Sequence, residues 1–198
     1  MSERGGIRGN LIVGIAFALY IWLLFWVVIL KYNNARVLSD GYDMLKNGVS
    51  NAYWGPPYKE LIPAIQNGNK DWYILESVLN ILLFVPLGMH VNKIFKCNLL
   101  QYAFIFLLPV AIEFSQTITY IGGLQLEDMV GNIVGLLLGL WIFQLFRINK
   151  KEHFWVQLHL VSLIVLVPLS VYSIINTIRH IELYEWVGQH LIELVCGS

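Results

Sequence analysis

The chain has 198 residues, of which 57% are hydrophobic and 13% are charged, and its formal net charge at pH 7 is zero. No basic tract is dense enough to follow a phosphate backbone, which argues against nucleic-acid binding, and the two cysteines match no metal-ligand spacing. Because the mean hydropathy is positive and several apolar runs are long enough to cross a bilayer, the composition indicates an integral membrane protein.

Five apolar runs are predicted to cross the membrane as helices, since each is close to the roughly 20 residues that span a bilayer. They cover residues 11–30, 73–90, 99–119, 128–146 and 155–175. The first follows a polar N-terminus, residues 1–10. No small-residue cleavage site comes after this run, which favours a retained span over a removed signal peptide. The sequence therefore predicts an all-α, polytopic membrane helix bundle over residues 11–176.

One connection between the spans is long. Residues 31–72 carry Asn-Gly and Gly-Pro-Pro turn signals, which predict a loop, and the aromatic residues Tyr53, Trp54 and Tyr58, which suit the headgroup level of a membrane. After the last span, residues 177–198 place apolar side chains on one side of a helix and mostly acidic ones on the other. This pattern predicts a C-terminal amphipathic helix at the membrane interface.

The lysines and arginines of the short loops predict the orientation. With the N-terminus in the cytoplasm, the inner segments hold Arg4, Arg8, Lys93, Lys96, Arg147, Lys150 and Lys151. The short outer link, residues 120–127, holds none, and the bases of the long outer connection are widely spread. We therefore expect a multi-pass cell-membrane protein with its N-terminus in the cytoplasm and its C-terminus outside, which puts Cys97 inside and Cys196 outside.

Polar side chains interrupt three of the five spans. They are Glu76 and Asn80, Glu113 and Gln116, and Asp128 and Asn132. The members of each pair are three or four residues apart and therefore share a helical face. At about 1.5 Å per residue, the predicted spans bring these pairs together within about 10 Å of their outer ends, and we call the six residues the polar cluster. A carboxylate in hydrocarbon costs about 2.5 kcal/mol or more, so the cluster is a candidate binding site.

The fourth span also carries a series of small residues. Gly131, Gly135 and Gly139 stand four residues apart, a spacing that lets a neighbouring backbone approach closely. At 100° per residue they fall within about 60° of Asp128 and Asn132, so the packing face and the polar face coincide. A homodimer through this glycine face is conceivable.

Three segments resemble the motif blocks of the VanZ-like family: ESVLNILLFVPLGMHV, AIEFSQTITYIGG and LEDMVGNIVGLLLGLWIF. The match, over about residues 76–146, rests on Asn80, Phe84, Pro86 and Gly88, on Glu113 and Gln116, and on Asp128, Asn132 and Gly135. It covers roughly a third of the chain, and its spacing extends over three spans, which makes chance agreement improbable.

The chain departs from the family pattern at one position. The family has an arginine shortly before the Asp, in a Gly-Arg step, where this chain has Gly122-Gly123. If the arginine holds an anionic group in the family, its role here is either lost or falls to Arg36, Lys59 or Lys70 of the long connection.

The resemblance implies reduced susceptibility to glycopeptide antibiotics, especially teicoplanin, in Gram-positive bacteria, which is a phenotype more than a reaction. Combined with the predicted orientation, it suggests that the polar cluster forms a pocket open to the outer leaflet. Such a pocket would contact a lipid-linked cell-wall precursor or a lipoglycopeptide, with membrane lipids around it. We expect no cofactor and no metal, although carboxylates with amide oxygens suit a hard cation such as Mg²⁺ or Ca²⁺.

Two alternatives stay open. An intramembrane enzyme acting on a lipid or wall precursor would use Glu113 and Asp128 as acid-base groups. It lacks an evident nucleophile, because Ser115 lies about 200° around the helix from Glu113 and no His or Lys is placed as a base for Ser77. A structural or sensor subunit would use the polar cluster as a clasp between helices, at about 0.6 to 2 kcal/mol for each pair.

The orientation is testable through the two cysteines. An impermeant thiol reagent applied to whole cells should label Cys196 and leave Cys97 unlabelled, because the membrane shields the inner side. Both should react once the cells are permeabilised. Labelling of Cys97 but not Cys196 would invert the orientation and move the polar cluster to the cytoplasmic side.

Overall fold

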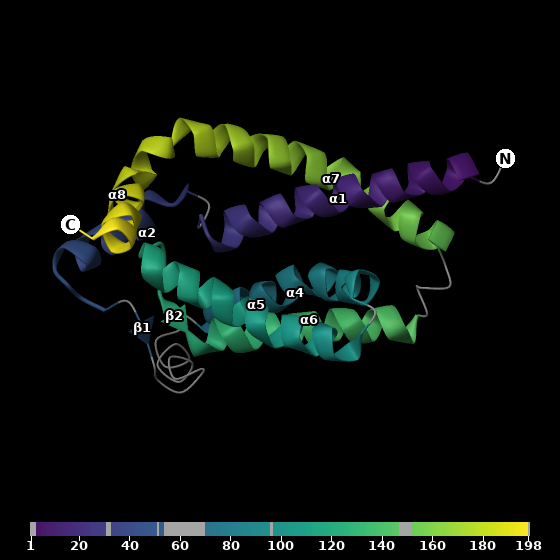
Figure 1. Cartoon of the computed structure of the whole chain (residues 1–198), viewed down its shortest axis with the longest axis horizontal. Coiled ribbons are helices and arrows are strands. Elements are labelled where there is room, and N and C mark those ends of the chain that lie inside the picture. The colour runs from purple at the N-terminus through teal and green to yellow at the C-terminus, as the bar shows by residue number, and fades with distance from the viewer. Residues whose placement is uncertain are drawn as a thin grey trace. The chain divides into compact units, whose positions relative to one another are not determined.

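The computed structural model describes residues 3–30, 33–50, 52–53, 70–95, 97–146 and 152–197. Among these residues, five helices are long and apolar enough to cross a membrane (Figure 1). They are α1 (Glu3–Val28), α4 (Lys70–Ile94), α5 (Asn98–Thr119), α6 (Leu126–Leu145) and α7 (Glu152–Arg179). Each overlaps one predicted span, which confirms the all-α membrane bundle. All five begin before the predicted span because polar turns continue the hydrogen-bond ladder beyond the apolar run.

The chain forms two compact units. The three-helix unit contains α4, α5, α6 and the two short strands β1 (Ala52–Tyr53) and β2 (Leu124–Gln125). The α1/α7 unit contains α1, α7, the turn of residues 118–122 and three shorter helices, α2 (Ala35–Lys46), η3 (Ile181–Tyr184) and α8 (Glu185–Cys196). All three helices that carry the predicted polar cluster therefore belong to the first unit.

Within the three-helix unit, α4 and α6 run in the same direction and touch through their backbones. A Cβ added at Gly135 would overlap the carbonyl oxygen of Ile81, and one added at Gly139 would overlap that of Val85. Gly88 of α4 meets the Leu136 carbonyl oxygen of α6 in the same way. Gly135 and Gly139 of α6 thus lie against the backbone of a neighbouring helix, and that neighbour is α4.

The α4 helix covers the glycine face on which the homodimer was predicted. A second copy could reach Gly135 and Gly139 only by displacing α4, at the loss of the contact just described. The homodimer itself stays a prediction, because the structure contains a single chain.

The α5 helix follows α4 after a short link and returns antiparallel to it. The buried side chain of Gln101 donates from Nε2 to the Phe95 carbonyl oxygen (2.7 Å) and to Asn92 Oδ1 (3.2 Å). The rings of Phe95 and Phe104 lie 5.3 Å apart. These contacts hold the start of α5 against the end of α4, so the end of α5 comes back toward the starts of α4 and α6.

The link from α5 to α6 contains β2, which pairs with β1 as a parallel ladder, Ala52 with Leu124 and Tyr53 with Gln125. The turn before β2 needs unusual backbone angles, since Tyr120 has φ 56° and Gly122 has φ 141°. A side chain at the second of these positions would be strained, which accounts for the glycine. The ladder thus joins the long connection to the start of α6, a pairing that the sequence did not predict.

In the α1/α7 unit, α1 and α7 also run in the same direction. The indole of Trp22 donates to Ser173 Oγ (2.6 Å), and the rings of Trp26 and Tyr172 lie 6.1 Å apart at 88°. Near the other end of the pair, a Cβ added at Gly9 would lie 3.0 Å from Val156. The pair is therefore in contact near both ends, through α1 side chains at one end and through Val156 of α7 at the other.

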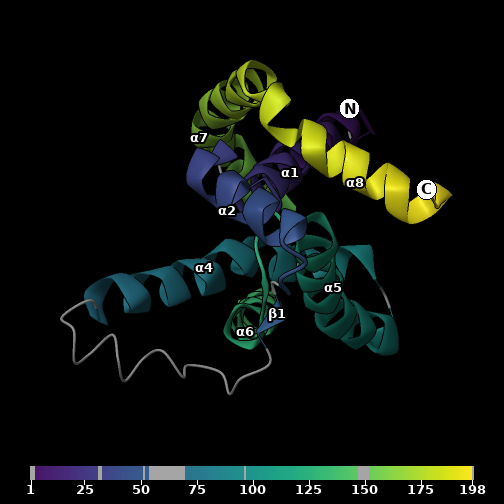
Figure 2. The ribbon, with the colours of Figure 1, turned by 90° about the vertical axis from the view of Figure 1, so that its left-hand side faces the viewer.

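At the end of α1 the chain reverses at Asn33, which is 8% exposed and has φ 57°. Its amide donates from Nδ2 to the Tyr184 hydroxyl (2.6 Å), and its Oδ1 accepts from Asn176 Nδ2 (2.8 Å). The Tyr184 hydroxyl donates in turn to the Leu30 carbonyl oxygen (2.9 Å). Burial raises the pKa of Tyr184 to about 12, so this donor keeps its proton well above neutral pH. One asparagine thus ties α1, α7 and η3 together. Figure 2 shows α1 and α7 of this unit together with α2 and α8.

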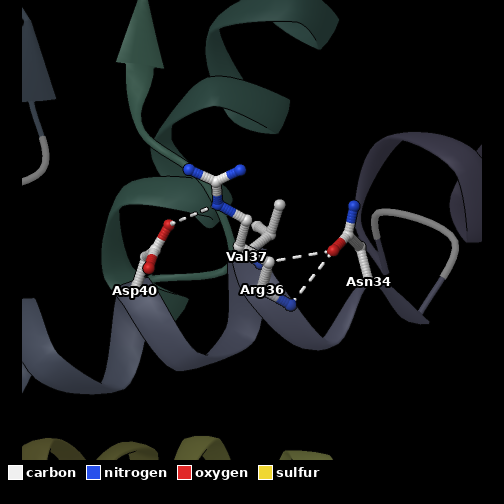
Figure 3. A network of polar contacts seen from close by, with 4 residues as sticks. All are labelled: Asn34, Arg36, Val37 and Asp40. Carbon is white, nitrogen blue, oxygen red and sulfur yellow. Dashed lines mark hydrogen bonds and ion pairs between the residues drawn. The ribbon is translucent and has the colours of Figure 1, made fainter.

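The prediction of a loop over residues 31–72 was wrong in its first part, where α2 lies. The Asn34 side chain caps this helix by accepting from the backbone N–H groups of Arg36 (3.1 Å) and Val37 (3.4 Å), and Arg36 forms an ion pair with Asp40 at 4.0 Å (Figure 3). Gly41 lies inside this helix, where glycine is unfavourable, and it therefore obscures the helical pattern in the sequence. In the structure, a Cβ at Gly41 would overlap the Tyr120 carbonyl oxygen. Trp54 and Tyr58 lie outside the described residues.

The predicted C-terminal helix is confirmed, but it begins later than expected. The first residues of the predicted segment 177–198 belong to α7, which ends at Arg179 and is followed by η3 and α8. On the apolar side, Val187 is buried with Leu38 and Ile121 in one core cluster, against which Leu191 packs. The α8 helix is therefore held to α2 through its apolar side chains.

The close approach of α4 and α6 is testable by adding one carbon atom. Gly139→Ala should lower the free energy of unfolding by about 1–3 kcal/mol, because the new Cβ forces the α4 backbone away. Thermal unfolding of the purified chain, followed by tryptophan fluorescence in detergent, measures the change. Gly14→Ala on α1 is the matched control, since its Cβ would meet no described atom within 4 Å. Equal unfolding temperatures for wild type and Gly139→Ala would contradict the backbone contact.

Candidate functional site

The predicted polar cluster draws on all three helices of the three-helix unit. Asn80 lies on α4, Glu113 and Gln116 on α5, and Asp128 and Asn132 on α6. The side chain of Glu76 lies outside the described residues, and only its place in α4 is given. Five members of the cluster can therefore be compared with the structure.

Asn80 and Asp128 form a direct bond between α4 and α6. The Asn80 amide donates from Nδ2 to Asp128 Oδ1 at 2.7 Å, and both side chains are partly buried. The packing of α6 on α4 brings these two side chains together. Gly131, three residues after Asp128, lies against Asn80, and a Cβ added to this glycine would be 3.7 Å from the Asn80 Cβ. A short bond to a carboxylate is among the stronger hydrogen bonds of proteins.

Glu113 is more deeply buried than Asp128, the other described carboxylate of the cluster. Its side chain is 2% exposed, and its Oε2 accepts from the backbone N–H of Gln125 at 3.0 Å. Gln125 is the N-cap residue of α6. Backbone N–H groups and the helix dipole make a helix N-terminus favourable for a negative charge. The start of α6 is thus a local partner for the Glu113 carboxylate.

The two carboxylates converge on one place, the first turn of α6. Asp128 belongs to that turn, and Gln125, which holds Glu113, immediately precedes it. Beside them, Gln116 and Asn132 are 1% and 3% exposed, so their amides are enclosed by the packed unit. The arrangement offers carboxylate oxygens and amide groups at one end of three helices, a set that can bind hydroxyl, amide or cationic groups.

The neighbouring hydroxyl groups on α5 donate to their own helix. Ser115 Oγ donates to the Ile112 carbonyl oxygen at 2.7 Å, and Thr117 Oγ1 donates to that of Glu113 at 2.9 Å. Ser115 therefore uses its hydroxyl proton within α5. This geometry does not favour Ser115 as a nucleophile.

Two histidines of the membrane helices, His90 on α4 and His159 on α7, are buried. His90 Nδ1 lies 2.7 Å from the Pro86 carbonyl oxygen, and His159 Nδ1 lies 2.8 Å from that of Trp155. Each ring is satisfied by the carbonyl four residues earlier in its own helix, which allows it to be buried. Within the described residues, no group of three or more His, Cys, Asp or Glu side chains is arranged to hold a metal ion.

Of the three bases considered in place of the family's arginine, only Arg36 has a described side chain. Arg36 lies on α2 in the α1/α7 unit and pairs with Asp40, and its side chain is 89% exposed. Lys59 and the side chain of Lys70 lie outside the described residues. The sequence did not predict that the backbone N–H of Gln125 is a partner of Glu113. A backbone donor is present whatever the side chain, so the residue type does not indicate it.

Comparison with known proteins connects this unit to a family. The family model described as VanZ/LLP1 matches residues 17–147, a range that contains α4, α5 and α6. A curated relative, Protein VanZ of Enterococcus faecium, is 30% identical over 141 residues, which cover 68% of this chain and 76% of that protein. No solved structure matches the chain.

The bond between α4 and α6 is testable with a double-mutant cycle. Asn80→Ala and Asp128→Ala should each destabilise the protein, and their coupling energy should be about 0.6–2 kcal/mol, as for other intramembrane hydrogen bonds. Unfolding of the purified chain in detergent measures all four species. Gln144→Ala, which removes an exposed amide from α6, is the control and should couple to neither residue. A coupling energy of zero would show that the bond contributes nothing to stability.

Proposed function

Because this chain belongs to the VanZ/LLP1 family, we propose that it lowers the susceptibility of the cell to teicoplanin-like glycopeptide antibiotics. The proposal assigns this effect to the polar cluster of the three-helix unit. In it, the cluster contacts either a lipid-linked cell-wall precursor or the lipoglycopeptide itself, both of which carry hydroxyl and amide groups next to a lipid tail. Membrane lipids surround the remaining faces of the helices.

The proposal places the cluster in the outer half of the membrane, with the N-terminus of the chain in the cytoplasm. The distribution of bases supports this orientation, since Lys93 ends α4 and no Lys or Arg occurs between residues 97 and 146. The opposite ends of α4 and α6, where Asn80 and Asp128 are bonded, would then face the outer leaflet. A pocket there can be reached by wall precursors and drugs without crossing the membrane.

The observation that carries the proposal is the buried carboxylate of Glu113. A neutral amide oxygen would also accept the Gln125 N–H, and it would avoid the cost of placing a charge in a buried membrane site. A clasp between helices therefore does not need an acid here. An acid is useful if it receives donors from a ligand, and Asp128 lies on the same first turn of α6.

A structural role is the second candidate, and the 2.7 Å bond between Asn80 and Asp128 favours it. In that case the cluster holds α4, α5 and α6 together, and protection depends on other parts of the chain. The two candidates differ in what they require of the carboxylates. Binding needs their charge, whereas a clasp needs only an oxygen acceptor of the same shape.

Glu113→Gln and Asp128→Asn separate these candidates, because each keeps an acceptor oxygen and removes the charge. Each variant should return the inhibitory concentration of teicoplanin to that of cells without the protein. Each should still reach the membrane in normal amount and unfold within a few degrees of wild type. The measurements are inhibitory concentration, immunoblot of the membrane fraction and thermal unfolding.

Glu193→Gln, which neutralises an exposed carboxylate on α8, is the control and should protect as wild type does. If both cluster variants also protect as well as wild type, the binding proposal fails and only the clasp remains. Loss of protection together with loss of the protein from the membrane would instead favour the clasp.

A further inference from the structure

A pocket lies in the α1/α7 unit, apart from the polar cluster, between α2, η3 and α8. Its volume is about 300 Å³, at the lower end of the range for small-molecule sites. Tyr42 and Ser39 of α2 line one side, and Glu182 of η3 and Trp186 of α8 line the other. The pocket is open to solvent and large enough for a headgroup-sized ligand.

Two aromatic rings shape the pocket. Tyr42 and Trp186 lie 6.0 Å apart, centroid to centroid, with their planes at 68°. The Trp186 ring is held because it packs against the core cluster of Leu38, Ile121 and Val187. Rings at a steep angle present π-electron faces in two directions, and such faces attract a cation within about 6 Å. The pair therefore resembles two walls of an aromatic cage.

The charge around the pocket is negative. Among the described residues Glu182 has no ion-pair partner, and its carboxylate is exposed at the pocket. The three helices that form the pocket contain the carboxylates Asp40, Asp43, Glu182, Glu185 and Glu193 and the permanent bases Arg36 and Lys46. Of these bases, Arg36 pairs with Asp40, and a third base, Arg179, ends α7 before η3. Five carboxylates against three bases give a local field that favours a positively charged ligand over an anion.

The pocket is close in sequence to the end of the apolar helix α7. The η3 helix starts two residues after the end of α7, and beside Glu182 the side chains of Ile178 and Ile181 are 65% and 64% exposed. Exposed isoleucines next to aromatic rings are typical of the level where a membrane helix leaves the hydrocarbon. A lipid whose tails lie along these side chains would bring its headgroup to the pocket.

We propose that this pocket binds the ammonium headgroup of a membrane lipid. The rings of Tyr42 and Trp186 contact the cation, the Glu182 carboxylate is its counter-ion, and the exposed isoleucines contact the acyl tails. The proposal uses residues of the α1/α7 unit alone. Its test is therefore independent of the proposal that the polar cluster protects against glycopeptides.

Short-chain lipids with matched tails test the proposal. The full chain, purified in dodecyl maltoside, is titrated with dihexanoyl phosphatidylethanolamine, phosphatidylcholine and phosphatidylglycerol, and bound lipid is counted by native mass spectrometry. The two ammonium lipids should bind about tenfold more tightly than the phosphatidylglycerol, because only they satisfy Glu182. Free ethanolamine should compete poorly with the lipid, since it lacks tails for the isoleucines.

Two substitutions locate the site. Glu182→Gln should weaken binding of phosphatidylethanolamine about tenfold, and Tyr42→Leu should weaken it about threefold, through loss of the counter-ion and of one ring. Glu185→Gln, an exposed carboxylate on the next turn that does not line the pocket, is the matched control and should bind as wild type does. Glu182 makes no described ion pair, so its variant should unfold at the wild-type temperature.

Three outcomes would overturn the proposal. Equal affinity for the three lipids would show that the headgroup charge is not recognised. Wild-type binding by Glu182→Gln would place the ammonium group elsewhere. Competition by free ethanolamine at the affinity of the lipid would show a site for soluble amines, without a role for the membrane.

Discussion

The contact between the backbones of α4 and α6 is the constraint on which the candidate site depends. Gly88, Gly135 and Gly139 leave no side chain on the line where the helices touch, so α4 and α6 approach to backbone distance. This contact sets the register that brings Asn80 opposite Asp128. Any side chain at these glycines would separate the helices and shift the polar groups. The packing face and the polar face of α6 are therefore one structural feature.

At the start of α6, a backbone N–H group is a partner of a buried carboxylate. Glu113 accepts from the N–H of Gln125, at the positive end of the helix dipole, and the acidic residue Asp128 lies in the same first turn. Where the family resemblance leads one to expect an arginine, this chain has Gly122-Gly123, and Gly122 has a φ of 141° that suits glycine.

The α1/α7 unit is organised by polar contacts of a different kind. Asn33 joins α1, α7 and η3 through one amide, and the core cluster of Leu38, Ile121 and Val187 holds α2 to α8. Both depend on residues distant in sequence. The resulting pocket is acidic and lined by aromatic rings, whereas the polar cluster lies in the other unit among apolar helices. The two sites therefore have separate structural origins and separate chemistry.

The sequence by itself determined the five membrane helices and the identity of the polar residues, because length, hydropathy and helical spacing are local properties. It also predicted the close approach at Gly135 and Gly139, since small residues four apart have few other uses in a membrane helix. Only the tertiary structure decided which helix fills that face, that Glu113 is held by a backbone N–H, and that α2 is a helix despite Gly41. Each of these depends on a partner far along the chain, such as the Ile81 carbonyl, the Gln125 N–H or the Tyr120 carbonyl. Backbone groups are the same in nearly every residue, so a pattern of side chains does not predict which of them will form a contact.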